Sequence, residues 1–321
     1  MPEAICFSIV IPVKNDEVNI ARCLSSLTRL AAPYVLLEVI VVDNGSTDRT
    51  LEIVNDYLGA LPLTILVRPG LFISALRNLG ASIAKGTWIA FLDSDCEVRA
   101  NWQDWAQKTI ASGWGNVFGS FYEIPEDSSW VATYWYGERE RKHGGEISYL
   151  PAGDLFFRGD VFRKLGGFDE SIQTNEDVEV CQRARTAGFP VVCVPELSVI
   201  HWGTPQTIGQ FFRKSRWHGT HVLRVFLQNL PRLLNLKPLL LAFYTILCLI
   251  AVGICLFLAV FGGHHLPLVM AAIALLLPFC MLGADAAIKT RKPRAILPMG
   301  VLFFVYALAR ASAFLYVRPH R

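Results

Sequence analysis

The chain has 321 residues, of which 53% are hydrophobic and 18% are charged. Soluble domains average about 45–50% and about 25%, so these values exclude a disordered or collagen-like protein and indicate that part of the chain does not face water. Residues 1–238 carry 23 basic and 26 acidic side chains, a net charge of −3, whereas residues 239–321 carry 7 and 1, a net charge of +6. The sequence therefore predicts two chemically different parts, and no nucleic-acid partner is indicated.

The cysteines and the first residues bear on the cellular compartment. None of the eight cysteines forms a CxxC pair, and three lie in apolar segments, so neither a zinc site nor a disulfide framework is indicated. Residues Met1 to Ala4 lack the basic start of a signal peptide, and the apolar stretch that follows is typical of a strand. We therefore expect the N-terminal part to lie in a reducing, cytosolic compartment.

Near-continuous apolar runs alternate with helical patterns along the first hundred residues. We expect strands at 7–13, 39–42, 64–67 and 88–92, with helices between them. Strands that are apolar on both faces and joined by helical crossovers predict a parallel sheet covered on both sides. In such α/β sheets, ligands bind at the carboxyl ends of the strands.

Polar residues gather at three of those ends, in the segments 12–17, 43–48 and 93–97. Asp93 and Asp95 place two carboxylates on one side of an extended segment, which suits a hard divalent cation. Two simpler interpretations stay open. The Asp43-Asn44-Gly45 segment is also typical of a tight turn in which Ser46 or Thr47 caps the next helix, and Asn15 and Asp16 are typical helix N-caps.

Four further residues are candidates by their positions. Arg77 lies on the helix before the Asp93 strand, where it can pair with a diphosphate or with one of the aspartates. Glu176 and Asp177 begin a helix that ends at Gly188; they either complement the helix dipole or supply a general base. His201 follows a strand at 191–194 and is either a ligand of the metal or diphosphate or a packed structural histidine. The segment from 136 to 146 is expected to be a surface loop, either plainly solvated or closing over a ligand.

The last third of the chain predicts membrane spans. Residues 239–261 are 23 consecutive residues without a charge, and a spanning helix needs about 20. A second uncharged run at 266–284 follows a short polar turn, so the two predict a helical hairpin. A third run at 295–317 is interrupted by Arg310, which either anchors the helix at the interface or contacts an anionic lipid group.

The basic residues predict the orientation. Lys and Arg are retained in short cytoplasmic loops, and the loop after the second span carries Lys289, Arg291, Lys292 and Arg294. Residues 205–238 contain cations but no acid, interleaved with large apolar side chains, which predicts helices lying on the membrane surface. The alternative is a positive flank that only orients the protein. Both place residues 1–204 on the cytoplasmic side, and three full spans would place the C-terminus outside.

The order of these segments resembles the inverting family 2 glycosyltransferases. Six motifs that occur in that family follow one another here: Ser8-Ile9-Val10-Ile11-Pro12 with Asn15 and Glu17, Val41-Val42-Asp43-Asn44-Gly45-Ser46-Thr47-Asp48, Arg77-Asn78-x-Gly80, Phe91-Leu92-Asp93-Ser94-Asp95, Gly166-Gly167-Phe168-Asp169-Glu170 and Glu176-Asp177. The resemblance, to membrane-anchored members of bacterial type, implies an α/β fold. A Rossmann-like GT-A catalytic domain with a mostly parallel sheet occupies residues 1–204, interfacial helices 205–238 and transmembrane helices 239–321.

The resemblance also implies ligands and roles. The donor is a nucleotide-diphosphate-sugar, the cofactor Mg²⁺ or Mn²⁺, and the location a bacterial inner membrane, with a cell-envelope product. Asp43 is expected to read the nucleobase, Asp177 to act as the catalytic base, and Glu176 to shape the acceptor site. The donor-binding candidates are Pro12, Asn15, Glu17, Asp43, Ser46, Arg77, Asp93 and Asp95. The metal candidates are Asp93, Asp95, Glu97 and His201. The acceptor and membrane candidates are Gly153, Asp154, Arg213, Arg216 and Trp217.

Three functional hypotheses follow. The first is transfer of one sugar to a lipid-linked or membrane-embedded acceptor, at a site whose cation stabilises the departing diphosphate. The second is a processive polysaccharide synthase, although Arg213-Lys214-Ser215-Arg216-Trp217 stands where such enzymes have Gln-x-x-Arg-Trp. The third is a silent nucleotide-sugar-binding scaffold, against which the intact Asp93, Asp95 and Asp177 argue. A homo-oligomer is compatible with all three, and membrane lipids are partners in each.

Overall fold

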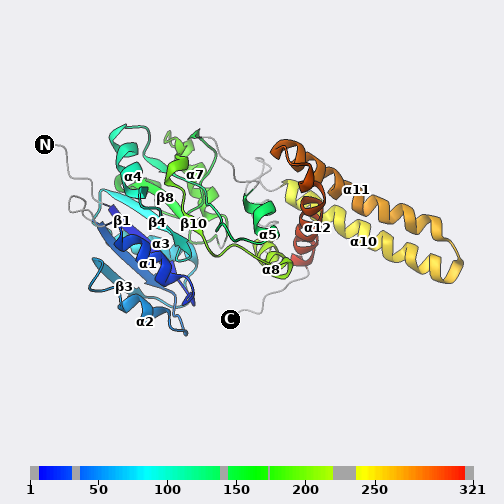
Figure 1. The fold of residues 1–321 in the computed structure, drawn as a ribbon, viewed down its shortest axis with the longest axis horizontal. Helices are drawn as coiled ribbons and strands as arrows, with labels where there is room; N and C mark the ends of the chain where they lie inside the picture. Colours follow the sequence, from blue (N-terminus) through cyan, green and yellow to red (C-terminus); the bar gives the residue numbers. More distant parts are fainter. Residues whose placement is uncertain (1–6, 31–36, 138–143, 173, 220–235, 315–321) are drawn as a thin grey trace. The chain divides into compact units, whose positions relative to one another are not determined.

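The computed structural model describes residues 7–30, 37–137, 144–172, 174–219 and 236–314. The chain divides into two compact units, which are taken in turn (Figure 1). The first contains Met1–Pro125 and Glu140–Gly203, and the second contains Glu126–Arg139 and Thr204–Arg321. Part of the predicted loop at 136–146 and part of the predicted interfacial segment at 205–238 fall on residues 138–143 and 220–235, outside the described residues.

The first unit is built on an eight-stranded sheet with the order β3-β2-β1-β4-β8-β6-β9-β7. Its first half is parallel, as the sequence predicts, and comprises β1 (Phe7–Val13), β2 (Leu37–Asp43), β3 (Leu63–Val67) and β4 (Trp88–Leu92). In the second half, β8 (Asp154–Arg158) is antiparallel to β4 and to β6 (Val117–Gly119). There β9 (Val191–Cys193) is parallel to β6, and β7 (Gly145–Glu146) is antiparallel to β9.

Helices cover both faces of this sheet, because its strands are apolar on both sides. They are α1 (Ile20–Thr28), α2 (Thr50–Asn55), α3 (Ile73–Ile83), α4 (Trp102–Ala111), α6 (Gly159–Leu165) and α7 (Glu176–Thr186). Successive side chains of β1 enter the two cores alternately: Ile9 and Ile11 pack on one face and Val10 on the other. A small separate ribbon pairs β5 (Cys96–Glu97) with β10 (Ile200–His201). A short 3₁₀ turn, η2 (Pro195–Leu197), precedes β10.

The second unit is helical. It contains α5 (Trp130–Ala132), a π-helical turn η1 (Thr133–Gly137), α8 (Ile208–Gly219), α10 (Leu236–Gly262), α11 (His265–Thr290), a 3₁₀ turn η3 (Pro293–Ala295) and α12 (Ile296–Ala313). The predicted spans 239–261 and 266–284 fall inside α10 and α11, which form a hairpin (Figure 1). The third predicted span, 295–317, corresponds to α12 up to the last described residues. All three helices are long and apolar enough to cross a membrane.

Candidate active site

The loops that follow β1 and β2 are joined by hydrogen bonds at the carboxyl edge of the sheet. The backbone N–H of Asn15 donates to the Ser46 hydroxyl (2.9 Å), and the backbone N–H of Thr47 donates to Asn15 Oδ1 (2.8 Å). Asn15 has a φ of 50°, in the left-handed region that asparagine tolerates better than most residues. Two predicted donor residues thus lie in one rigid polar edge.

Asp43 is fully buried at the end of β2, and its carboxylate organises its own turn. Its Oδ1 accepts the backbone N–H groups of Gly45 (2.8 Å) and Ser46 (2.9 Å), and its Oδ2 accepts the Ser46 hydroxyl. The tight turn considered from the sequence is present here. Pro12 is buried beside it in β1.

The beginning of α2 corrects one detail. Asp48 Oδ1 accepts the backbone N–H of Thr50 (3.0 Å), so Asp48 supplies the cap that the sequence suggested for Ser46 or Thr47. Glu17 Oε2 accepts the neighbouring N–H of Arg49 (2.9 Å). Glu17 therefore joins the first loop to the second, in agreement with its predicted place beside the donor candidates.

Arg77 connects two carboxylates from distant parts of the sequence. This side chain, only 3% exposed, donates from Nη2 to Asp93 Oδ1 (2.6 Å) and from Nη1 to Glu176 Oε1 (2.6 Å). The two anions keep the guanidinium charged although burial opposes it, and the net result raises the Arg77 pKa. Of the two partners considered from the sequence, the structure shows the aspartate, and it adds Glu176.

Asp95 faces His201 across the junction of β5 and β10. His201 Nε2 lies 3.5 Å from Asp95 Oδ2, and the ligand atoms of Asp95, His201 and Cys96 all lie within 4.8 Å of one another. A Cβ on Gly203 would stand 1.8 Å from Asp95 Oδ2, so only glycine permits this close approach of the backbone. A carboxylate and an imidazole held together in this way fit a divalent cation.

The other two metal candidates have different partners. Glu97 accepts from Arg29 Nη2 (3.0 Å) and from Trp202 Nε1 (3.0 Å), so both of its oxygens are engaged away from the Asp95–His201 pair. Asp93 is paired with Arg77 through Oδ1, and the Tyr122 hydroxyl lies 3.4 Å from its Oδ2. The structure therefore groups Asp95 with His201 and leaves Glu97 outside that group.

Two residues that the sequence reasoning missed complete this region. Tyr122 stacks on His201, with ring centroids 4.6 Å apart, and its hydroxyl accepts the backbone N–H of Gly153 (3.0 Å). Burial, together with Asp93, raises the Tyr122 pKa well above its ordinary value, so the hydroxyl stays protonated. Asp16, in the loop after β1, accepts from the Ser94 hydroxyl (2.7 Å), and burial raises its pKa. Asp16 could have been identified from the cluster of acids in 12–17 and 93–97, whereas no sequence pattern indicates Tyr122.

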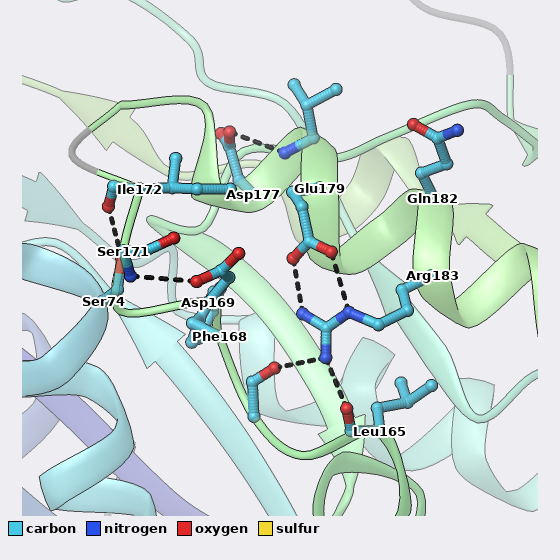
Figure 2. A network of polar contacts seen from close by, with 12 residues as sticks. Ser74, Leu165, Phe168, Asp169, Ser171, Ile172, Asp177, Glu179, Gln182 and Arg183 are labelled. Atoms are coloured by element: carbon cyan, nitrogen blue, oxygen red, sulfur yellow. Dashed lines mark hydrogen bonds and ion pairs between the residues drawn. The ribbon is translucent and has the colours of Figure 1, made fainter. Parts of the chain in front are cut away.

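Asp177 lies in the first turn of α7, where Figure 2 shows its surroundings. One oxygen accepts the backbone N–H of Val178 (2.8 Å). Burial and, secondarily, the negative Glu176 raise the pKa of Asp177 to about 7. A carboxyl group with this pKa can accept and release a proton near neutral pH, which is the property of a general base.

The helix that carries Asp177 is fixed to the preceding loop. Arg183, one turn after Glu179, donates to that carboxylate (Nε to Oε1, 2.8 Å). Its Nη1 also donates to the backbone carbonyl of Gly167 (2.8 Å) and to that of Leu165 (Figure 2). The loop that contains the Gly166-Gly167-Phe168-Asp169-Glu170 motif is thus joined to the last turn of α7, which carries Arg183.

The acceptor and membrane candidates have three different settings. Asp154 is fully buried in β8 and accepts from Trp102 Nε1 (3.0 Å) and from the backbone N–H of Ser120 (3.1 Å), so in this conformation its carboxylate is not available to an acceptor. Gly153 lies against Asp93 and Tyr122. Arg213, Arg216 and Trp217 belong to α8 in the second unit.

The comparisons with known proteins define the class. Residues 8–166 match the Glycosyl transferase family 2, and residues 88–284 match the Glycosyl transferase family group 2, which covers more than half of the chain. The chain is a glycosyltransferase and belongs to family 2. The predicted α/β fold of GT-A type with apolar C-terminal helices is confirmed.

The relatives match about two thirds of this chain. Glycosyltransferase AglE of Haloferax volcanii is 28% identical over 228 residues, which are 68% of this chain and 74% of AglE. The pre-mycofactocin glycosyltransferase of Mycobacterium tuberculosis is 29% identical over 229 residues, 66% of this chain and 46% of that protein. This chain therefore matches less than half the length of the second relative.

Solved structures share the fold. A mannosyltransferase from Pyrobaculum calidifontis, in complex with GDP-Man and Mn²⁺, superposes with a TM-score of 0.60 at 18% identity, over 95% of this chain and 86% of that one. TarS 1-349 of S. aureus in complex with UDP gives 0.51 at 21% identity, over 68% and 65%.

Proposed function

We propose that this protein is a membrane-anchored inverting glycosyltransferase that moves a sugar from a nucleotide-diphosphate-sugar to a lipid-linked or membrane-embedded acceptor at the cytoplasmic face. The observation that carries the proposal is the placement, in one unit, of the Asp95–His201 pair and of Asp177, whose pKa is about 7. The first suits a departing diphosphate, and the second suits an attacking hydroxyl.

The donor side is formed by the loops after β1, β2 and β4. The nucleotide lies at the edge where Asn15, Ser46 and Glu17 join two loops, and Asp43 holds the shape of the turn there. Two structural neighbours were solved with nucleotides of different bases, UDP and GDP-Man. Both bases are therefore worth testing on this chain.

A divalent cation would be held by Asp95 and His201. Because one ligand is an imidazole, the site favours Mn²⁺ over Mg²⁺, which prefers oxygen ligands. The cation would supply Lewis-acid stabilisation to the leaving diphosphate. Tyr122 keeps the His201 ring oriented by stacking on it, while Arg77 neutralises Asp93 and so limits the negative charge beside the diphosphate.

Asp177 acts on the acceptor. Its carboxylate takes the proton from the attacking hydroxyl on the sugar face opposite the diphosphate, so the anomeric configuration inverts. Glu176, held by Arg77, keeps the pKa of Asp177 raised. A phosphate acceptor is already ionised at pH 7 and would need no such base.

The second unit provides the membrane anchor. Its apolar helices are long enough to cross a bilayer, and the basic α8 and the loop that contains Arg291 and Arg294 favour a cytoplasmic position for the first unit. An enzyme held at the bilayer surface meets acceptors that are themselves confined there, which supports a lipid-linked acceptor.

The experiment is thermal unfolding of the full chain in detergent with UDP, GDP or dTDP, each with and without Mn²⁺. We expect one nucleotide to raise the midpoint in a Mn²⁺-dependent manner, and Asp95→Asn to abolish the metal-dependent part. Glu52→Gln, at an exposed carboxylate of the same unit, is the matched control and should respond like the wild type. A nucleotide shift that persists with Mn²⁺ in Asp95→Asn would remove the metal assignment. No shift with any nucleotide would favour a silent scaffold.

A further inference from the structure

The side of α12 that faces α8 is closely packed along much of its length. Trp135 of η1 lies between the two helices, with ring centroids 4.7 Å from Phe211 of α8 and 5.2 Å from Tyr306 of α12. Further along, a Cβ on Gly219 would stand 2.9 Å from the Cβ of Ala313 and 3.1 Å from Arg310 Cδ. The two helices therefore run together in the same direction, with small residues where they come closest.

This packing limits the depth of α12 in a bilayer. A helix that crosses the hydrocarbon with α8 beside it would carry Arg213, Lys214 and Arg216 into the apolar region, at a cost of several kcal/mol. Cations on an amphipathic helix are instead stable at the level of the lipid headgroups. The contact with α8 thus favours α12 lying in the interface.

The contacts of α12 with the α10–α11 hairpin also favour an interfacial position for α12. A Cβ on Gly283 of α11 would stand 2.9 Å from the backbone nitrogen of Gly300, and Phe304 packs on Phe279 (5.2 Å between centroids). Phe314, just after α12, stacks on Phe243, near the beginning of α10. Figure 1 accordingly draws α12 across the base of the hairpin instead of along it.

At this interface, cations from both helices converge. Arg310 Cζ lies 4.9 Å from the centroid of the Tyr306 ring, and its buried Nε has no hydrogen-bond partner. The charged neighbours of His218 are Lys214 and Arg310, which together with burial lower its pKa to about 3. Among the described residues, no ion pair joins Arg310 or His218 to a carboxylate; Asp285 of the same unit pairs with Lys289 (2.6 Å).

We propose that α12 does not cross the membrane but lies with α8 in the cytoplasmic headgroup region, where Arg310, Lys214 and His218 bind the phosphate group of a membrane lipid. A guanidinium presents paired donors to phosphate oxygens, and an anion would relieve the repulsion between the neighbouring cations. The inference rests only on the membrane anchoring of the proposed function.

Topology is tested first, with a protease-cleavable tag added after Arg321 of the full chain. In sealed membrane vesicles we expect the tag and the first unit to be cleaved from the same side. Cleavage of the tag from the opposite side would overturn the proposal, because α12 would then cross.

Lipid binding is tested on the full chain in phosphatidylcholine nanodiscs, without any sugar donor, so a failure here leaves the transfer reaction untouched. The ligands are an isoprenyl monophosphate and phosphatidylglycerol. We expect Arg310→Gln to weaken binding about tenfold, the loss of one hydrogen-bonded charge, while Arg294→Gln, at an exposed cation of the same unit, changes it little. Preference for the isoprenyl monophosphate assigns the site to a lipid-linked acceptor, and equal binding assigns it to bulk anionic lipid.

An equal loss in Arg310→Gln and Arg294→Gln would overturn the site, since it would indicate general attraction to a negative surface. So would unchanged binding in Arg310→Gln. If Arg310→Gln does not fold, Lys214→Gln takes its place, with the same expected loss and the same control.

Discussion

The polar groups at the donor edge and at the start of α7 differ in their hydrogen-bond partners and in the charge of their neighbours. At the donor edge, Asn15, Ser46 and Asp43 are satisfied by one another and by backbone N–H groups. At the start of α7, the Asp177 carboxylate accepts the backbone N–H of Val178 and has a negative neighbour in Glu176. The comparison teaches that the proposed binding edge has its hydrogen bonds already formed, whereas Asp177, the proposed base, is held in an environment that opposes its charge.

Arg77 joins Asp93, at the end of β4, to Glu176 in α7, and removing it should have the largest effect. Arg77→Met leaves the buried Glu176 and the half-buried Asp93 without a cation, and we expect a loss of about 3 kcal/mol in stability, together with loss of transfer. The midpoint of thermal unfolding in detergent measures the first. Adding Glu176→Gln to Arg77→Met removes one unpaired charge and should recover part of the midpoint. An unchanged midpoint in Arg77→Met would mean that the bridge contributes little.

Asp177 should determine how the rate of sugar transfer depends on pH. Its base form is required for a hydroxyl acceptor, and its pKa is about 7, so transfer should fall about tenfold per pH unit below that value and level off above it. Asp177→Asn should lower the rate by about 10²–10⁴-fold and remove this dependence. Glu179→Gln, two residues further along α7, tests whether any first-turn acid has the same effect. A mild Asp177→Asn phenotype would point to a phosphate acceptor.

The smallest effect is expected at the donor edge. Asn15→Ala removes an acceptor from Thr47 and places alanine at a positive φ, which together cost about 1 kcal/mol, or about fivefold in the Kd of the nucleotide measured by calorimetry. Asn15→Gly loses the same hydrogen bond without the backbone strain, so its Kd should lie between those of the wild type and Asn15→Ala. Equal affinity in all three would show that the nucleotide does not depend on this loop.

The sequence predicts the parallel half of the sheet and the apolar hairpin well, because both depend on local patterns. Strands β1 to β4 are continuous apolar runs, and α7 begins at Glu176 as predicted. The helix between β2 and β3 ends at Asn55, so Leu58, although at helical spacing from Leu51 and Val54, lies outside it and is exposed. An apolar side chain at helical spacing is not sufficient where no surface is available to cover it.

The candidate site is less predictable, because its contacts join residues far apart in the chain. Arg77 pairs with Glu176, 99 residues away, and Asp95 faces His201, in a sheet where β8 lies between β4 and β6. Short strands such as β6 and β10 have no clear sequence pattern of their own. The motifs identified the carboxylates, while their partners depended on topology. Asp154 shows the reverse case, a motif-adjacent acid that the fold uses in its core.

The connection between His201 and α8 is short, which limits the distance between them. Gly203 is the last residue of the first unit, and α8 begins at Ile208, seven residues after His201. Seven residues reach at most about 25 Å even when fully extended. Whatever the orientation of the two units, His201, a proposed metal ligand, therefore lies within about 25 Å of the start of α8. If α8 lies at the membrane surface, as proposed, that distance also limits how far His201 can be from the bilayer.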